Sequence, residues 1–280
     1  MSKVSICVPT YENAEGVKRL IDSILMQSYK DLEIIISDDS KTDIIETIVQ
    51  EYEDDRIKYF RHVNEGSSTA NWNNAIRKSK GEYIKVMHHD DWFTTETALN
   101  EFVKMLEDNP QAVLAFSGSR QVGQKVYDRC MNEEQEDCLR KDYRYVFCHN
   151  KIGAPSATIF RNDGKCFDEK LKWLVDSEFY MRILETDKQF VFTREPLVSI
   201  GIADTQVTNS CINNKCLLLR EYTYVYSKLG LSKSKMCKKK LYTVLYEQGA
   251  DWSDCKKYGI DSVSYVFYRL LKNIKNKLKE

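Results

Sequence analysis

Short runs of consecutive apolar residues alternate along the chain with longer segments whose apolar residues recur every three or four positions. The short runs predict strands buried on both faces, and the longer segments predict amphipathic helices. The predicted strands lie at residues 4–9, 33–37, 57–62, 83–87 and 113–118, and the predicted helices at 17–27, 43–52, 68–80 and 97–108. This alternation requires crossover connections. We therefore expect an α/β fold with a mainly parallel, Rossmann-like central sheet flanked by helices.

The alternation weakens after about residue 120. Residues 124–151 are polar and irregular, and we interpret them as a loop or lid over a site. Residues 153–160 are expected to form a turn entering a strand, and 189–202 another strand region, with a helix at 172–185 between them, and residues 214–249 predict two helices. The last helix has an apolar face opposite its lysines, formed by Val263, Val266, Phe267, Leu270, Leu271, Ile274 and Leu278. We predict a domain of residues 1–213, with halves 1–120 and 121–213, and a helical extension of residues 214–280.

Charge is balanced overall but unevenly distributed. The 280 residues carry 42 basic and 42 acidic side chains, so the net charge indicates no nucleic-acid partner. Residues 215–280 hold 15 Lys and Arg but 6 Asp and Glu, which leaves 27 and 36 in the first 214 residues. The basic tail either meets an anionic surface or is a solvated, lysine-rich helical end.

The cysteines and the N-terminal sequence indicate the cellular compartment. The nine cysteines are scattered, odd in number and without the CxxC spacing of zinc ligands, which favours a reducing cytoplasm. The chain enters an apolar strand within a few residues, without the apolar core of a signal peptide. No segment approaches the ~18 apolar residues of a membrane-spanning helix. We expect a cytoplasmic protein that is neither secreted nor membrane-spanning.

Polar residues follow each predicted strand of the first half. They lie at residues 9–12, 38–40, 64–66 and 88–91. In sheets of this kind, ligands bind beyond the carboxyl ends of the strands, so we expect these groups to converge at one edge.

The last of these groups, His88-His89-Asp90-Asp91, allows three interpretations. Two carboxylates after a buried strand can hold a hard divalent cation, with substrate phosphates and water completing its shell. They can instead cap a helix near Thr94. A zinc site is disfavoured, because adjacent strand residues point to opposite faces and the two histidines are poorly placed to chelate together.

Asp38 and Asp39 end the second predicted strand. They are suited to form a turn or to cap a helix, or to accept hydrogen bonds from a base or ribose. The first strand–helix turn, PTYENAEG, lacks the GxGxxG pattern, so a dinucleotide-dependent oxidoreductase is disfavoured.

Five segments together resemble the family 2 glycosyltransferases of the GT-A fold: VSICVPTYEN, LEIIISDDSKTD, NEGSSTANWNNAIRKSKGEYIKVMHHDDW, GAPSATIFR and LKWLVDSEFYMRIL. They occur in the family's order and spacing over residues 3–202. The resemblance implies an inverting, metal-dependent transferase that moves a sugar from a nucleoside-diphosphate sugar to a hydroxyl of a glycan or lipid-linked acceptor, in cell-surface polysaccharide synthesis. Residues 1–213 would then be the catalytic domain, with a nucleotide-sugar-binding half (1–120) and an acceptor-side half (121–213).

The resemblance also implies which residues contact the donor. These are Pro9, Thr10, Tyr11 and Glu12 in the first nucleotide loop, Asp39 at the base with Asp38 beside it, Asn73 in the third helix, and Gly153, Ala154 and Pro155 near the donor sugar and acceptor.

The catalytic roles come from the same resemblance. Asp91 would bind Mg²⁺ or Mn²⁺ bridging the diphosphate, and Asp90 the ribose, with Asp90 also available to the metal. Asp176 matches the general base, and burial would raise its pKa toward a useful value. Its alternative role is a helix N-terminal charge favoured by the macrodipole. The chain departs from the family where His88 replaces the first aspartate of the DxD pattern and Val175 the glutamate before the base.

Two other functions stay open at this stage. One is a GT-A-like module that binds a nucleotide or glycan without turnover. The other is a nucleotidyltransferase, which the lack of a glycine-rich, lysine-bearing first loop disfavours. The last helix either lies on an anionic membrane, with Tyr265 and Tyr268 near the boundary, or packs on the catalytic domain or a partner subunit in a homo-oligomer.

Overall fold

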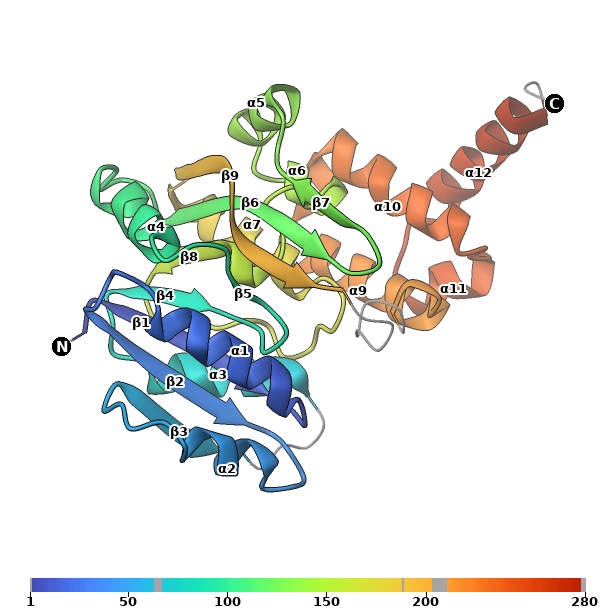
Figure 1. Cartoon of the computed structure of the whole chain (residues 1–280). Coiled ribbons are helices and arrows are strands. Elements are labelled where there is room, and N and C mark those ends of the chain that lie inside the picture. The colour runs from blue at the N-terminus through green and yellow to red at the C-terminus, as the bar shows by residue number, and fades with distance from the viewer. Residues whose placement is uncertain (1, 63–66, 188, 203–210, 278–280) are drawn as a thin grey trace. The chain divides into compact units, whose positions relative to one another are not determined.

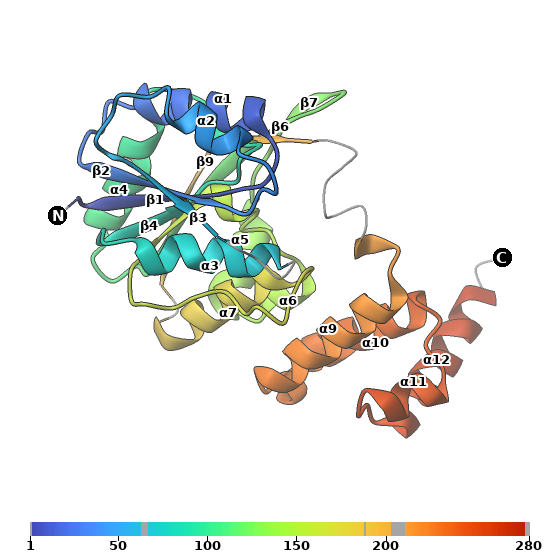
Figure 2. The same cartoon turned by 90° about the horizontal axis from the view of Figure 1, so that it is seen from below.

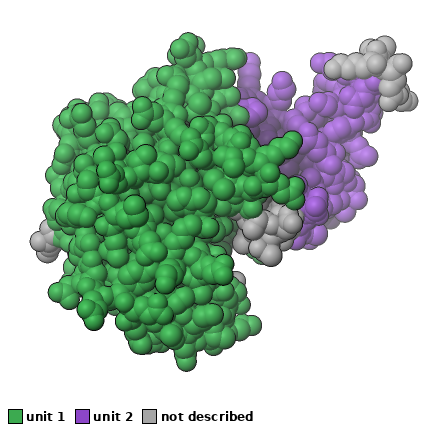
Figure 3. Space-filling model, viewed as in Figure 1, with its two compact units in different colours: residues 1–146, 150–204 green, residues 147–149, 205–280 purple. Residues whose placement is uncertain are grey.

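The computed structural model describes residues 2–62, 67–187, 189–202 and 211–277. The predicted strand end at 64–66 and Leu278 lie outside these residues. Two compact units make up the chain: residues 1–146 with 150–204, and residues 147–149 with 205–280 (Figure 3).

The first unit is built on one sheet. Within the described residues it has nine strands in the order β3-β2-β1-β4-β8-β6-β9-β5, with β7 paired to β6. Neighbours among β1–β4 are parallel, as is the β6–β9 pair, whereas β8, β7 and β5 pair antiparallel. The strands are β1 (Val4–Thr10), β2 (Leu32–Asp38), β3 (Ile57–Arg61), β4 (Tyr83–Val86), β5 (Trp92–Phe93), β6 (Leu114–Val122), β7 (Val126–Arg129), β8 (Thr158–Arg161) and β9 (Phe190–Gly201).

Helices cover both faces of this sheet, as the sequence pattern predicts. Figure 2 shows α1 and α2 over one face and α3 over the other. The helices of the first unit, up to the boundary segment α6, are α1 (Ala14–Leu25), α2 (Ile44–Val49), α3 (Ser68–Lys78), α4 (Ala98–Glu107), α5 (Glu133–Lys141), α6 (Tyr145–Cys148), the 3-10 turn η1 (Pro155–Ala157) and α7 (Val175–Asp187). The predicted α/β class with a mainly parallel sheet is therefore confirmed.

The interior explains why these segments form these elements. Every residue of β1 and β2 is buried, as expected for continuous apolar runs between two helical layers. α1 begins where the Asn13 side chain accepts a hydrogen bond from the Gly16 N–H, and it buries Val17, Leu20 and Ile24 in the core. The fixed backbones of β1, β2 and β4 thus end together along one edge of the sheet (Figure 1).

The interpretation of residues 124–151 as an irregular loop was wrong. β7 forms a hairpin with β6, and α5 begins at a capping box in which Asn132 and Gln135 bond each other's backbone N–H groups. All four residues of β7 are exposed, so the strand forms through backbone pairing and leaves no alternation of apolar residues in the sequence.

The second unit is helical. Its elements are α9 (Lys215–Lys228), the 3-10 turn η2 (Leu231–Lys233), α10 (Lys235–Glu247), α11 (Trp252–Lys257) and α12 (Ser262–Lys277). The predicted helices of the extension are confirmed. The Tyr242 ring of α10 meets the rings of Tyr265 and Tyr268 of α12 at centroid distances of 5.7 and 5.6 Å. Placing Tyr265 at a membrane boundary was wrong, because this side chain is 1% exposed, whereas Tyr268 is partly exposed.

In the part of the chain that the structure describes, none of the helices has the length and apolarity needed to cross a bilayer.

Candidate functional site

Residues 88–91, which follow β4, form a tight turn that we call the corner. The Asp91 N–H donates to the His88 carbonyl (3.0 Å), and the His88 N–H donates to Ser156 Oγ (3.0 Å). Asp91 is 2% exposed and its carboxylate accepts from the Gly201 N–H at 3.2 Å. Burial raises the pKa of Asp91 well above its ordinary value. Asp91 therefore holds the corner to β9 and η1.

Asp90 differs from its neighbour. Its side chain is partly exposed, and among the described residues no hydrogen bond or ion pair occupies its carboxylate, while its backbone carbonyl accepts from Arg19 at 2.9 Å. The helix-capping interpretation of the pair was wrong, because α4 begins only at Ala98, after the N-cap residue Thr97. Asp90 is thus the carboxylate of the corner that is open to a ligand.

The two histidines contact different elements. The His88 ring lies 4.5 Å from the Trp72 ring, centroid to centroid, and His89 Nδ1 lies 3.4 Å from the Pro9 carbonyl oxygen. Burial lowers the pKa of His88 to about 4, so its ring is neutral at physiological pH. His88 Nε2 is buried without a hydrogen-bond partner in the described part of the chain. His89 joins the corner to the end of β1.

Asp38 and Asp39, at the end of β2, also differ in their exposure to solvent. Asp38 is fully buried, and its carboxylate accepts from Thr10 Oγ1 (3.1 Å), the Tyr59 hydroxyl (2.7 Å) and Arg61 (3.2 Å). Asp39 is partly exposed, and its N–H donates to the Thr10 carbonyl at 3.1 Å. Asp38 therefore fixes the end of β1 against β3 and leaves Asp39 at the surface.

Glu12 joins the first two loops. Its carboxylate accepts from the N–H groups of Lys41 (2.7 Å) and Thr42 (3.1 Å) and from Thr42 Oγ1 (2.5 Å). The hydrogen bond from Thr42 lowers the pKa of Glu12. Its φ of 48° is a left-handed conformation that non-glycine residues seldom adopt. In the same loop Pro9 and Thr10 are buried, whereas Tyr11 is 47% exposed. Tyr11 is thus the accessible side chain among the four predicted here.

Asn73 is buried and bonded within the protein. Its Nδ2 donates to the Phe167 carbonyl and to the Glu169 carboxylate (both 2.9 Å), and its Oδ1 accepts from the Phe167 N–H (2.8 Å). Asn73 therefore holds residues 167–169 against α3. Its neighbour Asn71, which sequence reasoning missed, donates to the Thr10 carbonyl (3.1 Å) and so braces the first loop.

Asp176 lies in the first turn of α7 and is partly buried. Its Oδ1 accepts from the Ser177 N–H (2.7 Å), and its Oδ2 accepts from Asn150 Nδ2 (2.8 Å). Burial raises the pKa of Asp176 to about 6, against the smaller lowering effect of hydrogen bonds from the backbone N–H groups of Ser177 and Asp176. The result is an oriented carboxylate that is ionised at neutral pH and basic enough to take a proton.

One loop connects Asp176 to the corner after β4. Asn150 bonds Asp176 and also exchanges hydrogen bonds with the backbone of Gly153 (3.1 and 3.2 Å). Three residues further on, Ser156 Oγ accepts from the His88 N–H. Gly153 has a φ of 109°, which suits glycine. The predicted residues Gly153, Ala154 and Pro155 thus lie on the segment that links both acidic centres. Asn150 was not predicted, since no local pattern marks it.

Gly201 allows β9 to approach the corner closely. A Cβ atom there would lie 2.5 Å from the Asp90 carbonyl oxygen, closer than real contacts allow. We expect Gly201→Ala to displace Asp90 and to lower turnover about 100-fold, since a misplacement of about 1 Å has this effect. Steady-state kinetics test this. Gly118→Ala is the matched control, because its added methyl would lie 2.4 Å from the Arg194 carbonyl oxygen, a similar clash elsewhere on β9. Equal activity of the two variants would contradict this account of Gly201.

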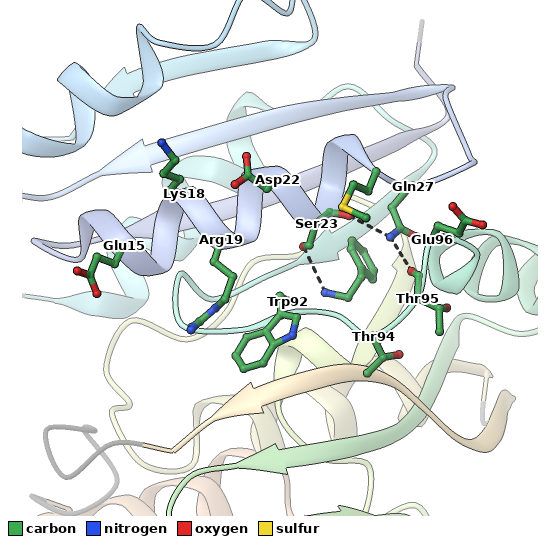
Figure 4. A pocket seen from close by; sticks show the side chains of 12 residues that line it. Glu15, Lys18, Arg19, Asp22, Ser23, Gln27, Trp92, Thr94, Thr95 and Glu96 are labelled. Atoms are coloured by element: carbon green, nitrogen blue, oxygen red, sulfur yellow. Dashed lines mark hydrogen bonds between the residues drawn. The ribbon is translucent and has the colours of Figure 1, made fainter.

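A pocket lies behind the corner, between α1 and residues 92–96, with a cavity volume of about 620 Å³ (Figure 4). The Arg19 guanidinium stacks on the Trp92 ring at 3.9 Å and donates to the Asp90 carbonyl. Ser23 accepts from the Phe93 N–H, and Gln27 donates to the Thr95 carbonyl at 2.8 Å. These contacts brace the corner from the side of α1.

The residues of the corner fit a cation shared with a substrate. Within the described residues no group of three or more His, Cys, Asp or Glu side chains is arranged to hold a metal ion. Mg²⁺ and Mn²⁺ commonly take one or two protein carboxylates and complete their shells with water and substrate phosphates. The open Asp90 carboxylate could supply such a ligand, whereas the Asp91 carboxylate is buried and accepts from the Gly201 N–H.

Comparison with known proteins gives three findings. The family model described as glycosyl transferase family 2 matches residues 5–164. An uncharacterized glycosyltransferase of Rickettsia typhi is 29% identical over 80% of this chain and 70% of its own length. A β-1,3-glucosyltransferase of Campylobacter jejuni, named for the acceptor GalNAc(5)-diNAcBac-PP-undecaprenol, is 39% identical over 32% of this chain and 30% of its own.

Among solved structures, residues 1–349 of Staphylococcus aureus TarS in complex with UDP-GlcNAc superpose with a TM-score of 0.68 at 16% identity. The match covers 87% of this chain and 72% of that one. The likeness confirms the predicted GT-A fold.

Proposed function

From the premise that this chain belongs to glycosyltransferase family 2, we propose that it transfers a sugar, with inversion, from a nucleoside-diphosphate sugar to a hydroxyl of a glycan or lipid-linked acceptor. That the protein is a glycosyltransferase follows from the family itself. The inversion, the metal and the acceptor class are the proposal.

The pKa and the orientation of the Asp176 carboxylate support the inverting mechanism. Inversion needs a base that removes the proton of the acceptor hydroxyl as its oxygen attacks the anomeric carbon from the face opposite the leaving diphosphate. Asp176 has a pKa of about 6 and is oriented by Asn150 and the Ser177 N–H. A carboxylate that is ionised at pH 7, yet more basic than an ordinary one, matches this task.

For the donor side we propose that Asp90 is the metal ligand and that Asp91 supports it. This differs from the roles that the resemblance implies, in which Asp91 binds the metal and Asp90 the ribose, because Asp91 is buried against Gly201 while the Asp90 carboxylate is open. A bound Mg²⁺ or Mn²⁺ would stabilise the negative charge of the departing diphosphate. Asp39 and Tyr11, the accessible residues of their loops, would contact the nucleoside. Pro9, Thr10, Glu12, Asp38 and Asn73 would shape these loops from within.

The acceptor class rests on the relatives. The Campylobacter jejuni protein is named for an undecaprenol-linked oligosaccharide acceptor, and we propose a lipid-linked or polymeric glycan acceptor for this chain too. The alternative, a module that binds without turnover, is weakened by the Asp176 geometry, because a protein that only binds a sugar nucleotide has no need of an oriented carboxylate with a raised pKa.

Donor turnover tests the proposal. Purified protein with Mn²⁺ or Mg²⁺ and a panel of nucleotide sugars is expected to release nucleoside diphosphate from one donor, faster with an acceptor, and to stop when a chelator is added. Release that persists in excess chelator would contradict the metal. Donor binding without release, with lipid-linked and polymeric acceptors supplied, would favour the binding module.

A further inference from the structure

An apolar stripe runs along the outer side of α12. We define it as the six exposed residues Val263 (73% exposed), Val266 (38%), Phe267 (65%), Leu270 (56%), Leu271 (45%) and Ile274 (55%). Their spacing of three and four residues places them on one face of the helix. Single exposed apolar side chains are common on protein surfaces, but six in a continuous stripe indicate a surface that binds something.

The opposite face fixes the orientation of α12 within its own unit. Tyr265 is 1% exposed, and its hydroxyl donates to the Ala250 carbonyl at 3.2 Å. The Tyr268 hydroxyl lies 2.8 Å from Thr243 Oγ1. These polar and aromatic contacts hold the helix against α10 and against Ala250, which lies between α10 and α11, without using the stripe. The stripe is therefore not required for the packing of the unit and points outward from it.

The charged residues around the stripe indicate what kind of surface binds it. The sequence of α12 contains four basic residues (Arg269, Lys272, Lys275 and Lys277) and no acidic one. By helical spacing, Arg269 and Lys275 lie on either flank of the stripe, and both are exposed, although Arg269 Nη1 also donates to the Ala250 carbonyl at 3.4 Å. Long basic side chains at this position can reach phosphate headgroups while the apolar face enters the acyl boundary.

A second copy of the chain fits this surface less well. Residues 215–280 carry 15 basic and 6 acidic side chains. Two copies packed stripe to stripe would bring two helices without acidic residues together, and like charges across an interface oppose association. A surface of anionic lipids instead attracts the basic residues and receives the apolar ones.

We propose that the α12 stripe docks the protein on an anionic lipid surface, with the helix lying in the plane of the headgroups. At 16 residues, α12 is about 24 Å long, shorter than the roughly 30 Å hydrocarbon core. Its length and its four cations therefore suit the interface. This inference goes beyond the proposed transfer and stands without it.

Vesicle flotation tests the proposal. The full-length protein is mixed with vesicles of equal parts phosphatidylglycerol and phosphatidylcholine, or of phosphatidylcholine alone, at roughly 0.15 M salt. We expect binding to the mixed vesicles to exceed binding to neutral ones, and Phe267→Glu/Leu270→Glu to lower it by at least about tenfold. Met26→Glu/Ile44→Glu adds the same charge at exposed apolar residues of the first unit and is expected to bind like the unchanged protein.

Three results would overturn the proposal. They are failure to bind the mixed vesicles, equal binding to neutral and mixed vesicles, and undiminished binding by the Phe267→Glu/Leu270→Glu variant. A self-association seen by sedimentation that this variant abolishes, without vesicle binding, would assign the stripe to contacts between copies. Because all four substituted residues are exposed, circular dichroism is expected to show folded variants. Lys275→Glu gives a second readout, since it should weaken binding to the mixed vesicles while leaving the stripe intact.

Discussion

Asp176→Asn is expected to lower kcat for sugar transfer by about a thousandfold, within the 10²–10⁴-fold that general base catalysis contributes. The amide keeps the size of the side chain and can still accept the Ser177 N–H, but it loses the oxygen that accepts from Asn150 and cannot take a proton. Donor affinity should change little, since the substitution removes a group that acts on the acceptor. Steady-state release of nucleoside diphosphate with a saturating donor measures the effect.

The same variant separates a chemical from a structural role. Burial raises the pKa of Asp176 to about 6, above the value of about 4 in an unfolded chain, so ionised Asp176 opposes folding. This cost is absent below pH 4 and grows as the pH rises from about 4 to 6. At pH 7 the Asp176→Asn variant removes this cost but also loses the acceptor of the Asn150 hydrogen bond, so its melting temperature should stay close to that of the unchanged protein. A lower melting temperature together with low activity would indicate structural damage. Asp108→Asn, at the exposed end of α4, is the control.

Substitution of Asp90 and of Asp91 is expected to affect turnover and the metal requirement differently. Asp90→Asn is expected to lower turnover at least about 100-fold and to raise the metal concentration needed for half-maximal activity, because a neutral amide is a weak ligand for a hard cation. Asp91→Asn should retain most of the turnover, because the amide oxygen can still accept the Gly201 N–H, and a neutral group removes the burial cost of the charge.

Metal titrations of both variants, followed by nucleoside diphosphate release, distinguish the two carboxylates. If Asp91→Asn raised the metal requirement and Asp90→Asn did not, Asp91 would be the metal ligand, as the family resemblance implies. If neither did, the cation would be held elsewhere.

The fold could be predicted from the sequence where packing is continuous along the chain. The runs at residues 4–9 and 33–37 are buried on both faces, and this made β1 and β2 visible in the pattern. β7 and α5 were missed, because the first forms through backbone pairing at an exposed edge and the second through a capping box in a polar segment. An element that buries few side chains leaves no periodic pattern of apolar residues in the sequence, so it cannot be predicted from that pattern.

The candidate site was only partly accessible to sequence reasoning. Family motifs identify the strand ends, but which of two adjacent acids faces outward depends on long-range partners. Asp38 is buried because Tyr59 and Arg61 on β3 bond its carboxylate, and Asp91 because Gly201 does. Asn150 contacts Asp176 across 26 positions in the chain, and no local pattern predicts such a pair. The predicted roles of these residues in binding and catalysis stay predictions.

The pH dependence of kcat/KM for nucleoside diphosphate release shows whether Asp176 is the general base of the reaction. With Asp176 as the base, kcat/KM is expected to be constant above pH 7 and to fall tenfold per pH unit well below an apparent pKa of about 6, since the protonated carboxyl cannot accept a proton. The residual activity of Asp176→Asn should lack this transition. If that variant kept both the rate and the transition of the unchanged protein, Asp176 would not be the base of the reaction.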